Sequence, residues 1–396
     1  MKALVLHPQD GPEVVKVEDI ETPVPGPTEL LIRVAAVALN PVDWMYVAYP
    51  IAKQERRVVG TDFAGTVVGI GNDVPGNDDR AKDGTRVAGF LQGACSVNDR
   101  PGAFAEYVAI DYDLVWAVPE QLSLEQAASI SMCGLTAAQG IFGRFGMPCP
   151  FGISVGSGDA FKSRNPTDGP VNYLVYGSST SLGLYMAQLI RLVEQTSGQR
   201  IRLIGAASSS KHDLLKQKPY SYDVLVDYRD EDWPEKVRAA TDGRGVDFAM
   251  DCISEGSTVE KVDSTFGPAK GKFAVIRAPR GGKYDPSRMR VKPMYGAVWE
   301  GLGVEIGYNG SVIPANPKER EFAATFYRFL GSGARGNEVI LEPNPIRIMS
   351  GGLDKIVPDG FTLLGTVRVS DRAASGRTEE YMRPISMEKL VYSLAA

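Results

Sequence analysis

Residues 171–183 have the sequence VNYLVYGSSTSLG and carry the strongest indication of the fold. Residues 171–176 form an apolar run typical of a buried strand, and the apolar spacing after Ser181 predicts a helix. A strand, a tight turn and a helix start direct backbone N–H groups and the helix dipole toward a phosphate. The strict GxGxxG pattern is absent, because only Gly177 and Gly183 remain and hydroxyl residues lie between them. The stretch predicts a dinucleotide site, and a plain structural turn is the alternative.

Further apolar runs follow this stretch and begin near residues 201, 224, 246 and 273. They lie roughly 20–30 residues apart with helical patterns between them, which indicates βαβ units in a parallel sheet. Residues 182–193 are predicted as the first crossover helix. Residues 151–170 are rich in Gly, Ser, Asn and Pro and predict a surface loop.

The first 150 residues have a different rhythm, with short β-rich runs separated by Gly, Pro, Asn and Asp. This pattern predicts a β-barrel-like domain. A helix is predicted at residues 123–130, because Ser123 and Gln126 match a capping box. An amphipathic segment at 319–330 and a strand at 389–394 are assigned to the same domain. The early strands are predicted at residues 2–6, 14–18, 30–39, 66–70, 86–90, 104–110 and 115–118.

Length and composition agree with two soluble domains. A chain of 396 residues is too long for one ordinary domain, and its 43% hydrophobic and 23% charged content is typical of globular proteins. A net charge of −5 without a basic block argues against nucleic acid as a partner. Two His and four scattered Cys weaken a zinc site, a disulfide scaffold and a His-based triad. Pro8 interrupts the N-terminal apolar run and no stretch approaches about 18 apolar residues, so no signal peptide or membrane span is expected and a cytoplasmic location is predicted.

The end of the second predicted strand indicates which dinucleotide binds. An NAD site places an Asp or Glu there for the ribose 2′-hydroxyl, whereas this chain has no carboxylate until Asp213. The three hydroxyls of residues 208–210 and the ammonium of Lys211 suit a ribose 2′-phosphate, so NADPH is favoured over NADH. The alternative is a solvated Ser-rich turn that caps a helix starting near Lys211. The predicted cofactor residues of this half are Gly177, Ser178, Ser179, Thr180, Ser181, Gly183, Ser208, Ser209, Ser210, Lys211 and, flanking the adenine, Tyr228.

Several further motifs carry a resemblance to a known superfamily. They are AVALNPVD at 36–43, VGTDFAGTVV at 59–68, GAFAEY at 102–107 and GLTAA at 134–138. With the nucleotide stretch they resemble the medium-chain dehydrogenase/reductase superfamily over nearly the whole chain. The VYGSST turn, the VDYR and DCI segments and the terminal EKLVY are most similar to fungal trans-acting enoyl reductases of polyketide synthases, including the lovastatin-pathway type.

The resemblance implies an α/β protein with a GroES-like β-barrel catalytic domain and a Rossmann cofactor domain with a doubly wound parallel sheet. The catalytic domain would comprise residues 1–150 and 315–396, and the NADPH-binding domain residues 151–314. The implied partners are a polyketide synthase or its acyl carrier protein and an acyl thioester, and the chain is expected to be a monomer. The further cofactor residues implied are Val42, Asp43, Met45, Ile276, Lys389 and Leu390.

The resemblance also places an acyl groove along two segments of the chain. The same side chains could be ordinary core, which is the alternative. The implied groove residues are Met132, Thr136, Ala138, Gln139, Phe142, Val298, Trp299, Glu300 and Gly301.

The zinc ligands of the alcohol dehydrogenases are missing from this chain. Their three positions match Asn40, Thr61 and Cys133, and one thiol cannot build a tetrahedral site. The loop that carries four structural cysteines in such enzymes retains Cys95 alone. No metal is therefore expected, and Cys133 is interpreted as a packing residue.

Two departures from the closest family concern the reaction itself. Related trans-acting reductases carry Lys where this chain has Met45, and Met can neither donate a proton nor hold an anion. Tyr46 is no obvious substitute, because a strand neighbour would point to the other face. Residues 385–388 lack the usual Gly before Glu-Lys-Leu, so the loop near the cofactor is expected to differ.

Enoyl reduction asks the protein mainly to position the acyl chain, stabilise the thioester oxyanion and let a proton reach the α-carbon. A trans-acting NADPH-dependent enoyl reductase is the favoured interpretation, with the catalytic residue left unassigned. A free-standing quinone or enone reductase is a second interpretation. A cofactor-binding synthase partner with lost or altered activity, because of Met45, is the third.

Overall fold

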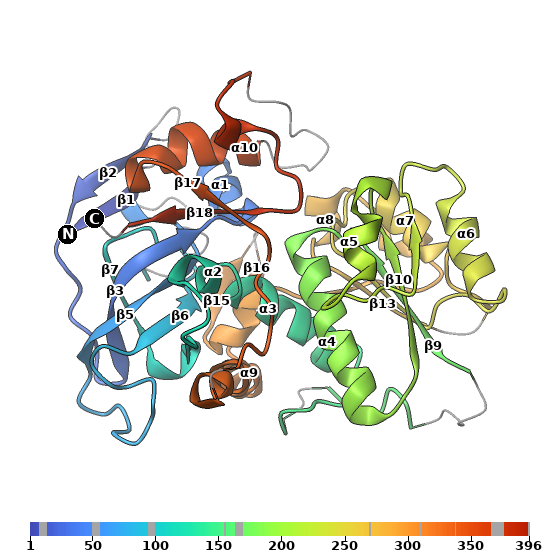
Figure 1. The fold of residues 1–396 in the computed structure, drawn as a ribbon, viewed down its shortest axis with the longest axis horizontal. Coiled ribbons are helices and arrows are strands. Elements are labelled where there is room, and N and C mark those ends of the chain that lie inside the picture. The colour runs from blue at the N-terminus through green and yellow to red at the C-terminus, as the bar shows by residue number, and fades with distance from the viewer. Residues whose placement is uncertain are drawn as a thin grey trace. The chain divides into compact units, whose positions relative to one another are not determined.

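The computed structural model describes residues 1–7, 14–49, 56–93, 100–153, 156–162, 169–268, 271–308, 311–336, 338–365 and 376–394. Its chain forms two compact units, and each unit contains its own β-structure (Figure 1). Unit 1 comprises Met1–Met132 and Trp299–Ala396, and unit 2 comprises Cys133–Val298. The unit boundaries lie at 132/133 and 298/299 rather than near 150 and 314, because the residues after Met132 and those up to Val298 pack with the parallel sheet.

Unit 2 contains a six-stranded sheet in the order β11-β10-β9-β12-β13-β14, and neighbouring strands in it run parallel. Strand order reverses beside β9, where a dinucleotide crevice forms in such sheets. The strands are β9 (Val171–Tyr176), β10 (Ile201–Ala206), β11 (Val224–Val226), β12 (Phe248–Asp251), β13 (Lys272–Val275) and β14 (Met294–Tyr295). The helices are α3 (Ser131–Ala138, which begins in unit 1), α4 (Ser181–Ser197), α5 (His212–Lys216), α6 (Trp233–Ala240), α7 (Ser257–Asp263) and α8 (Pro279–Gly282). The predicted parallel sheet and its first crossover helix are confirmed.

All six residues of β9 are buried, which explains why its sequence is a continuous apolar run rather than an alternating one. Leu174 pairs with Ile204 of β10 and with Ala249 of β12, so β9 is covered along both edges. One face of the sheet packs on Trp233 and Val237 of α6 and on the buried side of α7.

Unit 1 holds a seven-stranded sheet in the order β17-β18-β3-β5-β6-β8, with β7 paired to β3, and a three-stranded sheet in the order β2-β1-β4. The first sheet is built from β3 (Glu29–Ala38), β5 (Asp62–Ile70), β6 (Arg86–Phe90), β7 (Tyr107–Asp111), β8 (Val115–Ala117), β17 (Ile346–Met349) and β18 (Lys389–Ser393). The second contains β1 (Lys2–His7), β2 (Val14–Asp19) and β4 (Arg57–Val58), and a hairpin pairs β15 (Ile306–Tyr308) with β16 (Ser311–Ile313). The helices of unit 1 are α1 (Pro41–Ala48), α2 (Leu124–Ala128), α9 (Pro317–Gly336) and α10 (Thr362–Leu364). The predicted β-rich domain is confirmed.

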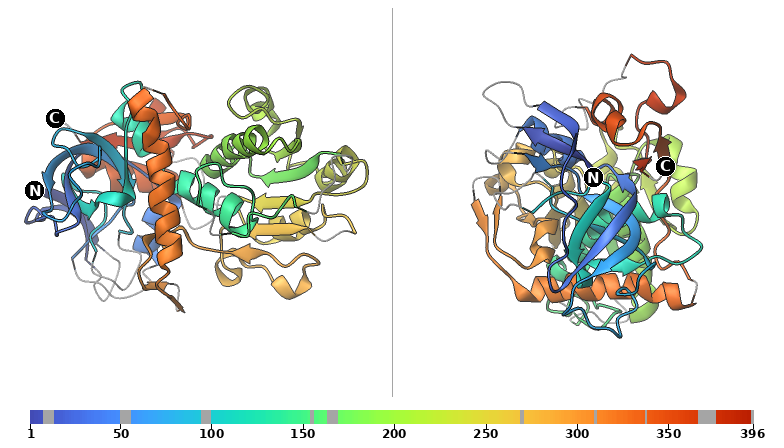
Figure 2. Two further views of the ribbon diagram at one scale, coloured as in Figure 1. Left: turned by 90° about the horizontal axis from the view of Figure 1, so that it is seen from below. Right: turned by 90° about the vertical axis from the view of Figure 1, so that its left-hand side faces the viewer.

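A C-terminal strand completes the seven-stranded sheet of unit 1. Strand β18 pairs antiparallel with β3 and parallel with β17, so Val391 lies opposite Ala38. Strand β3 (blue) and strand β18 (dark red) in Figure 1 therefore share one sheet. Helix α9 packs on β8 and is the long orange helix in Figure 2. The C-terminal strand thus brings Lys389 into the centre of unit 1.

Residues 41–48 are helical, so the expectation of a strand around Tyr46 was wrong. Pro41 occupies the first turn of α1, and Asn40 and Asp43 form a reciprocal capping box at its start. On a helix, Met45 and Tyr46 are separated by about 100° rather than lying on opposite faces. A second capping box forms at Ser123 and Gln126, where the sequence predicted it.

Candidate active site

The turn after β9 has the geometry of a phosphate cradle; residues 177–183 are called the phosphate turn below. Gly177 has φ 76°, a conformation that favours glycine. The N–H groups of Gly177 and Ser178 donate to the Ala206 carbonyl at 3.0 and 3.1 Å, which ties the turn to β10. A Cβ on Gly183 would lie 2.5 Å from the Gly177 carbonyl oxygen, so only glycine lets α4 pack this closely. The first turn of α4 then offers its N–H groups to an anion, which fits a dinucleotide pyrophosphate.

The hydroxyl residues of the phosphate turn divide into two kinds. Thr180 is the N-cap of α4, and its hydroxyl accepts from the Gly183 N–H at 3.1 Å. Ser178 is fully buried, and a Cβ on Gly205 would lie 2.8 Å from its hydroxyl oxygen. The Ser178 side chain therefore points into the packing between β9 and β10. Ser179 and Ser181 are partly exposed and can face an anion.

The Ser-rich turn after β10 forms a short 3-10 helix from Ser209 to Lys211. Ser209 and Ser210 are exposed, and Ser208 and Lys211 are half-buried. A carboxylate that the sequence did not predict lies at this turn. Asp227, one residue beyond β11, accepts a hydrogen bond from the Ser209 N–H at 2.9 Å. Burial acts to raise the pKa of Asp227, but the backbone N–H groups of Arg229 and Ser209 outweigh it and hold the pKa at about 2. Asp227 therefore remains charged and orders the turn from a neighbouring strand.

Tyr228 stands at the same edge of the sheet. Its ring lies edge-on to Tyr176 at a centroid distance of 6.3 Å, and the Arg229 guanidinium lies 4.8 Å above it. An aromatic ring covered by a guanidinium can flank a flat adenine, and Arg229 adds a second cation near Lys211. The sequence places Tyr228 and Arg229 together after the third predicted strand, where they could flank the adenine.

A buried aspartate orders the loop after β12. Asp251 accepts from the N–H groups of Ile253 and Ser254 at 2.8 and 2.7 Å and from the Thr258 hydroxyl at 2.7 Å. Burial raises the pKa of Asp251 to about 6. The Ser254 hydroxyl in turn accepts from the N–H of Ile276, so Ile276 is held by its backbone at the end of β13. These contacts place the predicted cofactor residue Ile276 at the same carboxyl edge as the phosphate turn.

In unit 1 the structure brings together a buried polar cluster, called the Lys389 network below. The Lys389 ammonium lies 2.7 Å from Asn40 Oδ1 and 2.8 Å from Asp62 Oδ2. Asn40 Nδ2 donates to the Thr61 hydroxyl at 2.8 Å and to Asp62 Oδ2 at 2.9 Å. The N–H of Met132 donates to Asp62 Oδ1 at 2.9 Å. The two positions matched to metal ligands, Asn40 and Thr61, are therefore neighbours, joined by an amide–hydroxyl hydrogen bond.

Asp43 lies beside this network at the start of α1. Its Oδ2 accepts from the Asn40 N–H at 2.6 Å, and burial raises the pKa of Asp43 to about 7. Val42 and Met45 are partly exposed on the same helix. Leu390 is buried in β18, and its carbonyl accepts from the N–H of Leu39 at 2.9 Å. The predicted cofactor residues of unit 1 are thus gathered at α1 and the start of β18.

The predicted acyl-groove residues are mostly packed. In unit 2, Ala138 and Phe142 are fully buried, and Phe142 lies edge-on to Phe151 at 5.2 Å. In unit 1, Trp299 is buried with its ring 5.8 Å from that of Phe90. Gln139, Val298 and Gly301 are buried as well, Met132 is 8% exposed, and Thr136 and Glu300 are half-buried. For Phe142 and Trp299 the structure supports the alternative, a core role.

The remaining predictions about metals and the membrane concern absences. Among the described residues, no three His, Cys, Asp or Glu side chains gather where they could hold a metal ion. Cys95 falls outside the described residues. Within the ranges that the structure describes, no helix is both long and apolar enough to cross a membrane.

The two units define the class of this protein, a barrel-like domain split in sequence around a Rossmann-type domain. Residues 26–120 match the alcohol dehydrogenase GroES-like domain family. The crystal structure of CurK enoyl reductase matches with a TM-score of 0.67 at 16% identity over 99% of each chain, a likeness of fold.

Two relatives are similar along almost the whole chain. The trans-enoyl reductase ACTTS2 of Alternaria alternata is 30% identical over 93% of this chain and 96% of its own. The trans-enoyl reductase thnE of Trichoderma harzianum is 30% identical over 90% of both chains. This chain belongs to the trans-enoyl reductases, oxidoreductases of the medium-chain dehydrogenase/reductase superfamily.

Proposed function

We propose that this protein is a trans-acting enoyl reductase that reduces an α,β-unsaturated polyketide thioester on a carrier protein. Its partner would be a polyketide synthase that relies on a separate protein for enoyl reduction. The observation that carries the proposal is the similarity to trans-enoyl reductases over more than nine-tenths of the chain. The phosphate turn supports it, because its glycines make room for a pyrophosphate at the start of α4.

When bound, NADPH would supply the hydride for the β-carbon of the thioester, and a proton would complete the α-carbon. The chain's own residues would hold the cofactor: the first turn of α4 would direct its N–H groups at the pyrophosphate, and the carboxyl ends of β10 and β11 would receive the adenosine half. Met45 offers neither a proton nor a charge, so the proton must come from another group or from water.

The direct test measures NADPH consumption with a crotonyl or methylcrotonyl thioester, on pantetheine and on the carrier protein. Oxidation of NADPH with the saturated thioester as product is the expected result. Equal turnover of small enones and carrier-bound thioesters would favour a free-standing quinone or enone reductase instead. No NADPH oxidation with any thioester, alone or with the partner synthase, would contradict the proposal.

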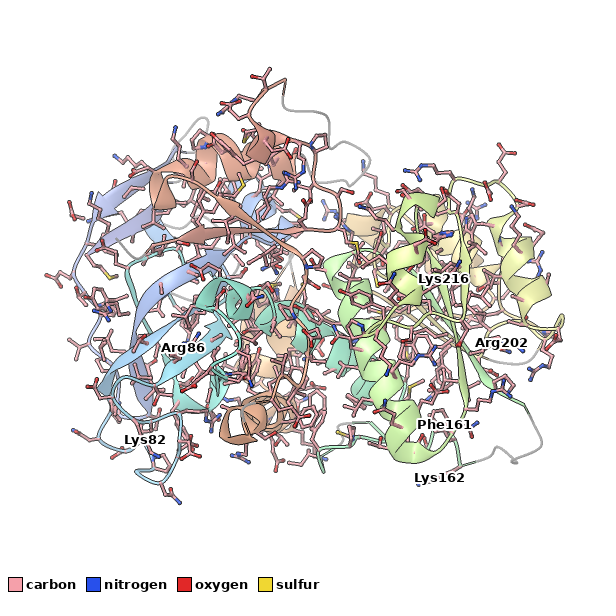
Figure 3. All side chains as sticks on the ribbon, in the orientation of Figure 1. Lys82, Arg86, Phe161, Lys162, Arg202 and Lys216 are labelled. Carbon is pink, nitrogen blue, oxygen red and sulfur yellow. The ribbon has the colours of Figure 1, made fainter. Side chains whose placement is uncertain are left out.

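The preference for NADPH over NADH rests on Lys211 and Arg229, which lie at the turn that would receive a 2′-phosphate. Asp227 lies at the same turn, and its carboxylate would repel a 2′-phosphate. The preference for NADPH therefore needs a direct binding test. Replacing Lys211 by Met should weaken NADPH binding roughly tenfold, about 1.4 kcal/mol, and leave NADH binding unchanged. The matched control is Lys216→Met on α5, an exposed lysine of the same unit (Figure 3). Tighter binding of NADH than of NADPH by the unaltered protein would overturn this preference.

Met45 favours a second candidate, a cofactor-binding synthase partner with lost or altered reductase activity. It lies partly exposed on α1, on the helix that carries the predicted cofactor residues. NADPH binding without turnover would support this candidate, and Met45→Lys should then raise turnover. No gain from Met45→Lys would show that this residue is not the cause.

A further inference from the structure

Lys389 is buried to a degree that is rare for a lysine. Its side chain is 2% exposed and that of its partner Asp62 is fully buried. Removing two charges from water is costly, so a buried pair is tolerated only when hydrogen bonds satisfy both groups. Here both oxygens of Asp62 accept hydrogen bonds, and the ammonium donates to an amide oxygen as well as to the carboxylate.

The network joins segments that are far apart in the chain. Lys389 lies 349 positions from Asn40 and 327 from Asp62. Asn40 is the N-cap of α1, Asp62 begins β5, and Asp62 also holds the N–H of Met132 in α3. One ammonium therefore links the start of α1 to the first residue of β5 and, through Asp62, to the N–H of Met132.

The segment that delivers Lys389 is itself tightly held. Met387 has φ 78°, a left-handed conformation that a side chain disfavours. Glu388 pairs with Arg347 at 2.6 Å and with Arg383. The guanidinium of Arg347 is buried and also donates to the carbonyls of Tyr381 and Pro384 at 3.1 Å. A strained residue that neighbouring ion pairs keep in place is typical of a segment whose exact position matters.

We propose that Lys389 is a positioning residue for hydride transfer: its buried ammonium holds Asn40 and Asp62 so that α1 starts in one fixed orientation. This role rests on the proposed function. Val42, Asp43 and Met45 lie within the first five residues of α1 and follow the orientation of its N-cap. A displacement of about 1 Å at such a segment can cost about a hundredfold in rate, even when the fold survives. Lys389 then acts through Asn40 rather than by touching the reacting atoms.

The test separates this role from a purely structural one by removing both charges together. Lys389→Met alone leaves a buried carboxylate without its cation, and Asp62→Asn alone leaves a buried cation, so both single variants should be unstable. The double variant Lys389→Met/Asp62→Asn carries no charge at either of these two positions, and the amide oxygen that it places at position 62 can still accept from the Met132 N–H. It should fold with a melting temperature near that of the unaltered protein.

The double variant should nevertheless reduce the enoyl thioester at least about tenfold more slowly, with KM for NADPH changed by less than about threefold. Its primary isotope effect with deuterated NADPH should be larger, because a misplaced α1 makes hydride transfer the slow step. Lys216→Met is the control and should match the unaltered protein in all three measurements.

A double variant with unaltered kcat and isotope effect would overturn this role and leave the ion pair a contribution to folding. Loss of folding in the double variant would overturn it as well, because the network would then be needed for the structure itself. An unaltered protein that reduces no enoyl thioester would overturn the proposed function, and this role with it.

Discussion

The phosphate turn of unit 2 and the Lys389 network of unit 1 are built in opposite ways. The turn is made by seven consecutive residues that follow one strand, and its glycines and hydroxyls are visible as a motif. The network joins residues more than three hundred positions apart, and each of them alone is an ordinary side chain. A local site can therefore be found from spacing, whereas a buried ion pair is found only when the strands are assembled.

The largest expected effect on stability comes from breaking the Lys389 network. Lys389→Met should lower the free energy of unfolding by about 3–5 kcal/mol, because it leaves the Asp62 carboxylate buried without its cation. Chemical denaturation measures the loss, with exposed Lys216→Met on α5 as the matched control that changes little. A loss below about 1 kcal/mol would mean that water or another cation reaches Asp62.

The second effect is a pH dependence that comes from Asp43. Its pKa in the folded protein is about 7 instead of the ordinary 3.8, so between these values the folded state holds a proton that the unfolded chain has released. Stability is therefore greatest at the acidic end of this window and is lost as the pH rises through it. At about 1.4 kcal/mol per pH unit, the loss between about pH 5 and pH 7 is at most about 3 kcal/mol.

Asp43→Asn removes this titration and keeps an oxygen that accepts from the Asn40 N–H. Unfolding in urea at the two pH values should show a smaller loss for Asp43→Asn than for the unaltered protein. Equal losses would show that Asp43 does not titrate in this range.

The third effect concerns the phosphate turn. Gly183→Ala should cost about 1–3 kcal/mol, because the new Cβ meets backbone atoms of Gly177 and Ser178 that cannot give way. It should also abolish cofactor binding, measured by titration of NADPH fluorescence. Gly198→Ala at the end of α4 is the control. Its Cβ would meet nothing within 4 Å, so the left-handed φ of 69° is the only unfavourable feature of this substitution. Unchanged cofactor affinity in Gly183→Ala would remove the phosphate turn from the site.

The smallest effect concerns Met387, whose φ of 78° lies in the left-handed region that favours glycine. Met387→Gly and Met387→Ala both remove the long side chain. Only Ala retains a Cβ atom, which is the source of the strain in the left-handed conformation. The Gly variant should be more stable than the Ala variant by about 1 kcal/mol in thermal unfolding. Equal stabilities would mean that the left-handed conformation carries no strain there.

Helix α1 could have been predicted from the sequence, because Asn40, Pro41 and Asp43 together form a helix-start signal. The same signal was recognised at Ser123 and Gln126 and was confirmed there. At α1 it was overridden by the β-rich run before it, which ends at Ala38. Asp227 is different: no spacing rule connects it to Ser209, since the contact forms only when β10 and β11 lie side by side.

Apolar periodicity, glycine and helix caps act over a few neighbouring residues, so the sequence alone established the parallel sheet, the phosphate turn and the β-rich first domain. It also established the absence of histidine ligands at Asn40 and Thr61. The assembled fold was needed to show that Ser178 turns inward, that Phe142 and Trp299 belong to the core and that Lys389 reaches Asp62. These outcomes depend on which strands become neighbours, because burial and charge pairing are properties of that assembly rather than of any segment.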